Sequence, residues 1–160
     1  LLETGGAIKH AVDLLGDEPF LIHNVDILSN VDLKALIAAH SEADSAATLL
    51  VSKRNSTRAL LFSPEGNLTA WTNKTTGEVK SPYSDIDISN LNEFAFSGIH
   101  IFSPRLFKYF GAYPEKFSII DFYLNTCKDE KIKAYTQEGL QLLDVGKLDS
   151  LEKAEEFVKS

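Results

Sequence analysis

Residues 19–52 contain two short apolar runs on either side of an amphipathic segment, and this pattern limits the fold more than any other feature. The run 19–24 reads PFLIHN and the run 46–52 reads AATLLVS, and each has the length and character of a buried strand. Between them, Asp32 precedes LKALIAAHSEA, whose apolar positions recur at helical spacing, so we expect Asp32 to cap a helix. Strand, helix and strand in this order predict an α/β fold with a parallel sheet.

The remaining sequence continues the alternation of strand-like and helix-like segments. Thr4 is expected to cap a helix from about residue 5 to 15. Residues 58–71 form two apolar runs around the turn sequence Pro64-Glu65-Gly66-Asn67, which is typical of a hairpin. The polar residues 72–93 are expected to cross the surface without forming a domain. The other expected elements are a strand at 94–103, helices near 104–109 and in FSIIDFYLNTCKDE, paired strands in IKAYTQ and LQLLDV, and a terminal helix in DSLEKAEEFVK.

Composition and charge exclude several classes of protein. The chain has 160 residues, 44% of them hydrophobic and 24% charged, as expected for one globular domain with a real core. A net charge of −7 without a dense Lys/Arg cluster argues against nucleic-acid binding. Cys127 is the single cysteine, and no run of about 18 apolar residues predicts a membrane span. We therefore expect a cytoplasmic protein that binds neither nucleic acid nor membrane, with a homo-oligomer possible.

Two acids follow apolar runs that lie far apart in the sequence. Asp26 comes just after the run 19–23, and Asp144 ends the apolar run in LLDVGK. In open α/β sheets, ligands bind outside the carboxyl ends of the strands. Two carboxylates that meet there can hold Mg²⁺, with phosphate and water oxygens completing its coordination. The alternative is that each acid only caps the segment that follows it.

The segment ETGGAI, residues 3–8, places two glycines at the start of a helix. Glycines there let a ligand approach the backbone closely, and the exposed N–H groups suit a base edge or a phosphate. The alternative is an ordinary helix start in which Gly5 and Gly6 relieve crowding. The residues alone leave both interpretations open.

Four segments, taken in order, resemble one enzyme family. LETGGAI, PFLIHNVDIL, FSGIHIF and LLDVGKLDSLEKAEEF are similar to segments in the later two thirds of the sugar-1-phosphate nucleotidyltransferases. The nearest likeness is to the branch that holds N-acetylmuramate-1-phosphate uridylyltransferase and mannose-1-phosphate guanylyltransferase-like enzymes. The resemblance spans nearly the whole chain and implies a Rossmann-like three-layer α/β/α sandwich with a mostly parallel mixed sheet. It also makes simple capping by Asp26 and Asp144 the minority interpretation.

The resemblance implies a reaction in which an oxygen of a sugar 1-phosphate attacks the α-phosphorus of an NTP. An NDP-sugar, a precursor of cell wall or polysaccharide, then forms as pyrophosphate leaves. By motif, Asp26 and Asp144 match the family's catalytic aspartates, which hold Mg²⁺. The likeness of ETGG to uridylyltransferases favours UTP over GTP. The matched substrate-binding positions are Glu3, Thr4, Gly5, Gly6 and Asn24 on the nucleotide side, and Ser97 and Gly98 on the sugar side.

The sequence departs from the family pattern at three places. Val25 stands where relatives usually have Gly or Ser before the metal aspartate. Many relatives carry E-K-P after the hairpin, and Asn73-Lys74 lies at the comparable place, so Lys74 is a candidate contact for substrate phosphate. The alternative for Lys74 is a solvated surface side chain. The family's Gly-rich triphosphate-binding loop has no match here, so we expect residues 1–160 to be a partial domain that lacks its N-terminal units and is inactive or nearly so alone.

Two functions from other classes remain open. A glycosyltransferase that uses an NDP-sugar shares the sandwich architecture, but it usually presents a D-x-D metal motif, whereas this sequence has NVD at residues 24–26. A noncatalytic domain that binds an NDP-sugar and regulates a partner is the other alternative. Unaltered function after substitution of Asp26 by Asn would favour the noncatalytic domain, because loss of a metal-binding charge impairs catalysis far more than folding.

Overall fold

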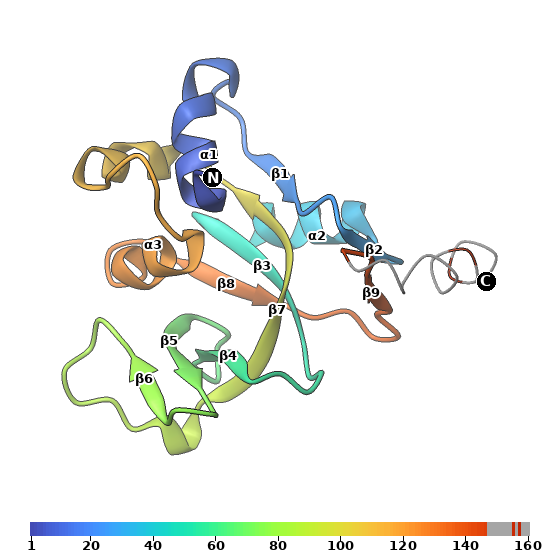
Figure 1. The fold of residues 1–160 in the computed structure, drawn as a ribbon, viewed down its shortest axis with the longest axis vertical. Coiled ribbons are helices and arrows are strands. Elements are labelled where there is room, and N and C mark those ends of the chain that lie inside the picture. Colours follow the sequence, from blue (N-terminus) through green and yellow to red (C-terminus); the bar gives the residue numbers. More distant parts are fainter. Residues whose placement is uncertain (147–154, 156, 158–160) are drawn as a thin grey trace.

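The computed structural model describes residues 1–146, 155 and 157, and Figure 1 shows their path. The sequence correctly predicts the type of most elements, including the hairpin around residues 64–67. The α-helices are α1 (Glu3–Ala11), α2 (Leu33–Glu42) and α3 (Ile119–Thr126), and the 3₁₀ helices are η1 (Val12–Leu14), η2 (Ile88–Asn90) and η3 (Pro104–Ala112). The strands are β1 (Phe20–His23), β2 (Ile27–Ser29), β3 (Ala47–Ser52), β4 (Arg58–Phe62), β5 (Leu68–Asn73), β6 (Glu78–Lys80), β7 (Asn92–Phe102), β8 (Ile132–Tyr135) and β9 (Leu142–Asp144).

One mixed sheet dominates the described part of the chain. Its strand order is β6-β5-β4-β7-β3-β8, and β1 pairs with β7 on the side opposite β3. The predicted α/β class and mixed sheet are confirmed, but the expectation of mostly parallel pairing is wrong. Among the described strands only β3 and β8 pair in parallel. The reason is β7, which lies between β1 and β3 and pairs antiparallel with both. β1 and β3 therefore run in the same direction but do not pair with each other.

The two C-terminal strands do not pair with each other as the sequence predicts. β8 joins the main sheet beside β3, whereas β9 forms a separate two-stranded sheet with β2. In that small sheet, Ile27 lies opposite Asp144. β9 thereby reaches the segment that follows β1, which is the segment that carries Asp26.

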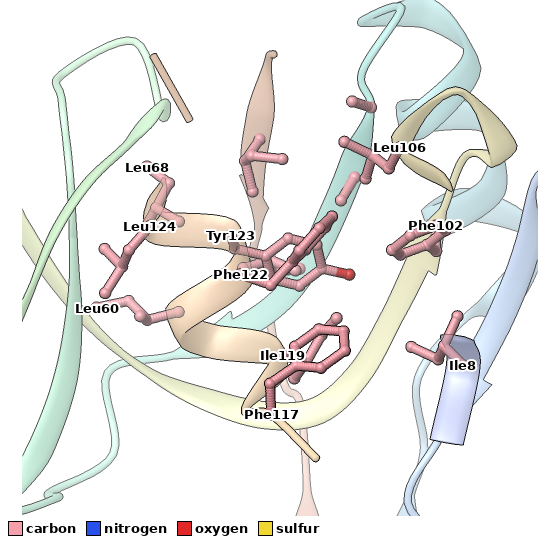
Figure 2. Close-up of a cluster of buried hydrophobic side chains, with 14 of the residues drawn as sticks. Ile8, Leu60, Leu68, Phe102, Leu106, Phe117, Ile119, Phe122, Tyr123 and Leu124 are labelled. Carbon is pink, nitrogen blue, oxygen red and sulfur yellow. The ribbon is translucent and has the colours of Figure 1, made fainter. Parts of the chain in front are cut away.

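Helices cover both faces of the sheet, as expected for a three-layer sandwich (Figure 1). On one face, α1 and α3 enclose a large aromatic core, and Figure 2 shows Phe122 and Tyr123 of α3 beside Phe102 of β7. On the other face, Leu36 of α2 packs against Leu50 and neighbouring aliphatic side chains. Burial of one such side chain is worth about 1.5–3 kcal/mol, so the aromatic face, which buries more side chains, makes the larger hydrophobic contribution.

The capping predictions have mixed outcomes. Asp32 caps α2 as expected, accepting hydrogen bonds from the backbone N–H groups of Lys34 and Ala35 at 3.0 Å each. The prediction for Thr4 is wrong, because α1 already begins at Glu3 and Thr4 lies within its first turn. The terminal helix predicted in DSLEKAEEFVK lies outside the described residues, apart from Glu155 and Phe157, which are helical.

Candidate functional site

Asp26 and Asp144 converge where β1 and β9 end. The backbone N–H of Val145 donates to the carbonyl of Asp26 at 2.8 Å, which ties the two segments together. A Cβ placed on Gly146 would lie 3.1 Å from Asp26 Oδ2 and 3.2 Å from Asp144 Oδ1. Both carboxylates therefore face the open position that a side chain on Gly146 would occupy, and Asp144 Oδ1 also accepts a hydrogen bond from the backbone N–H of Gly146 at 3.0 Å. Both aspartates are exposed to solvent.

A bulge in β7 lies beside this pair. Leu49 pairs with His100 and Val51 with Phe96, so Leu50 alone faces the three residues 97–99 of β7. Bulges of this kind redirect side chains and are common next to active sites. The hydroxyl of Ser97 donates to the carbonyl of Leu50 at 2.7 Å and replaces a ladder bond that the bulge removes. Ser97 is buried, so the structure gives its hydroxyl a structural partner, and a contact with sugar stays a prediction.

Gly98 and Asn24 are brought together at the bulge. Gly98 has a φ of +78°, and a Cβ added there would lie 2.6 Å from Nδ2 of Asn24. The backbone N–H of Asn24 also donates to the carbonyl of Gly98 at 3.0 Å. Only glycine meets both requirements, the left-handed backbone and the close approach of Asn24. The bulge thus fixes Asn24 two residues before Asp26.

A cavity of about 710 Å³ opens on the face of the sheet that α1 and α3 cover. Its floor follows from strand register, because directly paired residues of antiparallel strands present their side chains on one face. One row across β4, β5 and β6 is Arg58, Asn73 and Glu78, and the next row is Leu60, Trp71 and Lys80. The remaining lining includes Glu3, Arg54, Phe96, Ser118 and Asp121.

The charges in this cavity are unevenly paired. Lys80 lies over the ring of Trp71 at 5.0 Å and 3.7 Å from a carboxylate oxygen of Asp121. Arg54 donates from Nη2 to the carbonyl of Phe96 at 3.0 Å. Within the described part of the chain, neither Arg54 nor Arg58 forms an ion pair with a carboxylate. The cavity therefore presents two guanidinium groups whose charge is not neutralised by a neighbour.

A buried histidine lies behind the cavity wall. The ring of His100 contacts Phe96 with 5.3 Å between ring centres and meets Tyr123 edge-on at 5.6 Å. His100 is fully buried, and among the described residues neither of its ring nitrogens has a hydrogen-bond partner. Burial lowers its pKa from 6.5 to about 3, so the ring is neutral at physiological pH.

The residues of ETGG divide between the cavity and the packing of α1. Glu3 lines the cavity and lies 3.8 Å from the ammonium of Lys116. Added Cβ atoms would lie 2.4 Å from the ring of Phe117 at Gly5 and 2.2 Å from the carbonyl oxygen of Glu115 at Gly6. The chain's own loop thus fills the space that both glycines leave. Relief of crowding accounts for these two positions, and their approach to a ligand stays a prediction.

Lys74 and Val25 lie away from the cavity. Lys74 forms an ion pair with Glu93, the residue that pairs with Leu61 on the face opposite the floor row. Lys74 lies in the turn that follows β5, and its ion pair with Glu93 holds it on that face. The structure therefore does not bring Lys74 to the cavity, and its contact with substrate phosphate stays a prediction. Val25 is 98% exposed and does not narrow the space between Asn24 and Asp26.

The two aspartates fit a site for a hard divalent cation. The described residues contain no cluster of three or more His, Cys, Asp or Glu side chains able to hold a metal ion. Mg²⁺ does not require one, since it is commonly bound by one or two carboxylates together with phosphate and water oxygens. The shared open position at Gly146 meets that requirement.

Comparison with known proteins decides the family. The sequence matches the Nucleotidyl transferase family over residues 2–160. This chain belongs to that family. It is 31% identical over 111 residues to N-acetylmuramate alpha-1-phosphate uridylyltransferase of Neisseria meningitidis serogroup B, an alignment that covers 66% of this chain and 41% of that protein.

Solved structures share the fold of this nucleotidyltransferase chain. HddC from Yersinia pseudotuberculosis aligns with a TM-score of 0.66 and 23% identity over 98% of this chain and 63% of its own. UDP-glucose pyrophosphorylase aligns with a TM-score of 0.71 and 19% identity over 99% of this chain and 63% of its own. The inositol-1-phosphate CTP transferase of T. maritima aligns with a TM-score of 0.71 and 16% identity, covering 62% of its length. The chain thus spans less than two thirds of these relatives.

Sequence reasoning missed the arginines of the cavity. Arg54 follows the carboxyl end of β3, the same kind of position that drew attention to Asp26, whereas Arg58 lies at the amino end of β4. Their recurrence four residues apart beside a strand end was the available signal.

Among the described residues, no helix has the length and apolar character needed to cross a membrane.

Proposed function

We propose that this chain is part of an enzyme that makes an NDP-sugar and pyrophosphate from an NTP and a sugar 1-phosphate. The observation that carries the proposal is the convergence of Asp26 and Asp144 on one open position beside the bulge of β7. The two aspartates come from segments more than a hundred residues apart in the sequence, yet β2 and β9 bring them together. Nucleoside triphosphates are cytoplasmic substrates, so we place the reaction in the cytoplasm.

Asp26 and Asp144 would hold Mg²⁺ in this enzyme. When bound, the ion supplies charge neutralisation at the α-phosphate of the nucleotide. The residues of the chain do the rest by positioning. Asn24, held against Gly98, would lie on the nucleotide side of the carboxylates, and Glu3 and Thr4 would lie along the base and ribose. Gly5 and Gly6 would contribute indirectly, by letting α1 pack against residues 115–117.

The reaction itself requires no covalent link to the protein. An oxygen of the sugar 1-phosphate forms a bond to the α-phosphorus of the NTP, and the bond from that phosphorus to the β-phosphate oxygen breaks. Pyrophosphate carries away the electron pair. Holding the two substrates in line is the main contribution of the protein, because phosphoryl transfer depends chiefly on positioning and electrostatic stabilisation.

We propose UTP as the nucleotide and GTP as the second choice. The uridylyl group in the name of the Neisseria relative supports UTP. The structure of HddC, whose alignment shows the fold alone, was determined with GMP-PN, so GTP belongs in any test.

The test is pyrophosphate release by the full-length protein with UTP, GTP, CTP and dTTP, each combined with a panel of sugar 1-phosphates. We expect release with one nucleotide and sugar pair in Mg²⁺ and none in EDTA. If no pair gives pyrophosphate while the folded protein still binds an NDP-sugar, the proposal is wrong. Transfer of sugar to an acceptor would then identify a glycosyltransferase, and its absence would identify a regulatory domain.

A further inference from the structure

We infer that Asn30 and Gln137 are positioning residues, whose side-chain amides hold β9 against β2 and thereby set the separation of Asp26 and Asp144. The inference rests on the proposed function, because it concerns the metal centre that this function requires. The amides act from a distance. Asn30 comes three residues after Ile27, which lies opposite Asp144, so its backbone is about 10 Å from that position at about 3.3 Å per residue.

The sheet that carries Asp144 is small. β2 and β9 pair over three residues on each strand, and among the described strands neither of them pairs with the main sheet. None of these six residues is buried. Two paired strands alone are marginally stable in water. Other contacts must therefore hold both ends of the pair if Asp144 is to keep a fixed place.

Two side-chain amides join the chain segments at the far end of this small sheet, and we call them the amide clamp. Asn30 donates from Nδ2 to the carbonyl of Gly139 at 3.1 Å and accepts at Oδ1 from the N–H of Gln141 at 2.8 Å. Gln137 donates from Nε2 to the carbonyl of Asn30 at 3.2 Å and accepts at Oε1 from the N–H of Asp32 at 2.7 Å. Each amide thus bridges two backbone groups of the opposite segment, using both its donor and its acceptor.

The clamp ties β9 to a well-packed part of the fold. The N–H that Gln137 engages belongs to Asp32, the residue that caps α2. α2 is itself anchored by Leu36, which is fully buried against the main sheet. The other end of β9 is tied by the hydrogen bond from Val145 to Asp26. With both ends fixed, β9 presents its terminal carboxylate at a set distance from that of Asp26.

Apolar packing is the alternative account of how β9 is held. Ile27, Val31 and Leu140 pack against the cluster that contains Leu36. Such contacts are not directional, so they keep β9 near α2 without fixing its register. The paired hydrogen bonds of the amides do fix the register, and a slip of one residue would turn the side chain of Asp144 to the other face. We therefore assign the positioning to the amides.

The first measurement is the affinity of the full-length protein for Mn²⁺, a paramagnetic substitute for Mg²⁺, followed by electron paramagnetic resonance without nucleotide. We expect Asn30→Ala and Gln137→Ala each to weaken binding about 10-fold, as for groups that orient metal ligands without touching the metal. The double variant should lose little more than either single variant, because the two amides act as one unit.

Asn125→Ala is the matched control. It removes an amide on α3, away from β9 (Figure 1), whose Nδ2 donates to the hydroxyl of Tyr113 at 3.0 Å. The control is expected to bind Mn²⁺ as the unsubstituted protein does. A loss of affinity as large as that of Asn30→Ala would overturn the inference, because the effect would then not be specific to the clamp.

Asn30→Asp separates the hydrogen bonds from the shape of the side chain. The carboxylate keeps an acceptor for the N–H of Gln141, but it cannot donate to the carbonyl of Gly139. A negative charge at this distance would by itself attract the cation slightly. Weaker Mn²⁺ binding is therefore the expected result, and unchanged or tighter binding would overturn the inference.

Amide hydrogen exchange of the metal-free, full-length protein follows β9 directly. We expect peptides that cover residues 139–146 to exchange about 10-fold faster in Asn30→Ala and in Gln137→Ala, because the pairing of β9 opens more often. Peptides from β3 and β7 should exchange as before, which verifies that both variants are folded. If either the exchange of residues 139–146 or the Mn²⁺ affinity is unchanged in both variants, the inference is wrong.

Pyrophosphate release separates this inference from the proposed function. We expect both alanine variants to need about 10-fold more Mg²⁺ for half-maximal release and to keep kcat at saturating Mg²⁺. Release with an unchanged Mg²⁺ requirement refutes the inference and leaves the proposed function standing. Weaker Mn²⁺ binding and faster exchange in the variants, with no release by the unsubstituted protein from any substrate pair, supports the inference and refutes the proposed function.

Discussion

The polar side chains at the two ends of the β3–β7 strand pair differ in their burial and in their hydrogen bonding. At the amino end of β3, His40 is buried and hydrogen-bonded through both ring nitrogens, to Thr48 at 2.9 Å and to Ser103 at 3.0 Å. At the carboxyl end, Asn24, Asp26 and Asp144 are exposed around the bulge, and Asp144 Oδ1 accepts one local hydrogen bond, from the backbone N–H of Gly146 at 3.0 Å. Buried and fully paired polar groups stabilise a fold, whereas exposed polar groups with free acceptor positions are available to a ligand. We call these the closed end and the open end.

The sharpest test of the open end is to fill the position on which its carboxylates converge. Gly146→Ala places a methyl group about 3 Å from both Asp26 Oδ2 and Asp144 Oδ1. We expect kcat/KM for pyrophosphate release to fall about 100-fold, because displaced ligands hold a metal ion poorly. The melting temperature should be nearly unchanged, since Gly146 is exposed.

Gly16→Ala is the matched control for that substitution. Within the described part of the chain, no atom lies within 4 Å of a Cβ added at Gly16, apart from its immediate chain neighbours. The control is expected to change neither activity nor melting temperature by a measurable amount. Equal activity of Gly146→Ala and Gly16→Ala would show that the open end is no more sensitive to an added methyl group than ordinary protein surface.

The closed end is expected to show the reverse pattern. His40→Leu removes the partner of Thr48 and one partner of Ser103, whose hydroxyl keeps its bond to the carbonyl of Ser45 at 3.1 Å. Leaving buried groups unsatisfied costs about 2 kcal/mol of unfolding free energy. Urea denaturation measures this loss, and kcat/KM of the folded variant should be unchanged. A loss of activity without a loss of stability would show that the closed end has a functional role.

His100, midway between the two ends, predicts a pH dependence of stability. Because burial lowers its folded pKa to about 3 from 6.5, the unfolded chain binds more protons between those values. Stability is therefore full above pH 6.5 and is lost as the pH falls, by up to about 1.4 kcal/mol per pH unit from this group. Urea denaturation from pH 7 to 4 measures the slope.

His100→Phe isolates this contribution. The substituted ring keeps the contacts with Phe96 and Tyr123, and it loses no hydrogen bond because neither nitrogen of His100 has a partner among the described residues. We expect the variant to depend less on pH than the unsubstituted protein. Parallel curves would show that His100 does not supply the slope. His23→Phe, at an exposed position, is the control.

The sequence predicts local features well and long-range pairing poorly. Asp32 as a cap, the hairpin at residues 64–67 and the strand ends at Asp26 and Asp144 follow from neighbouring residues. The insertion of β7 between β1 and β3 does not follow from neighbouring residues, because the sequence of an apolar strand does not specify which strand it pairs with. β9 was mispaired for the same reason.

The candidate site shows the same division. Asp26, Asp144, Asn24 and Gly98 are recognisable from motifs, and the structure brings them together. Arg54 and Arg58 lie near the two ends of the loop between β3 and β4, and only the folded structure shows that both line one cavity. Lys74 faces away from the cavity and pairs with Glu93, an orientation that a motif alone does not fix.

The central claim is that Asp26 and Asp144 form one metal-binding centre for nucleotidyl transfer. The most direct measurement is pyrophosphate release by the full-length protein with saturating Mg²⁺, compared with Asp26→Asn, Asp144→Asn and Asp13→Asn, an exposed acid outside the site. The account predicts a loss of at least about 100-fold in both site variants, no loss in the control, and unchanged melting temperatures throughout. Release by either site variant at the rate of the control would contradict it.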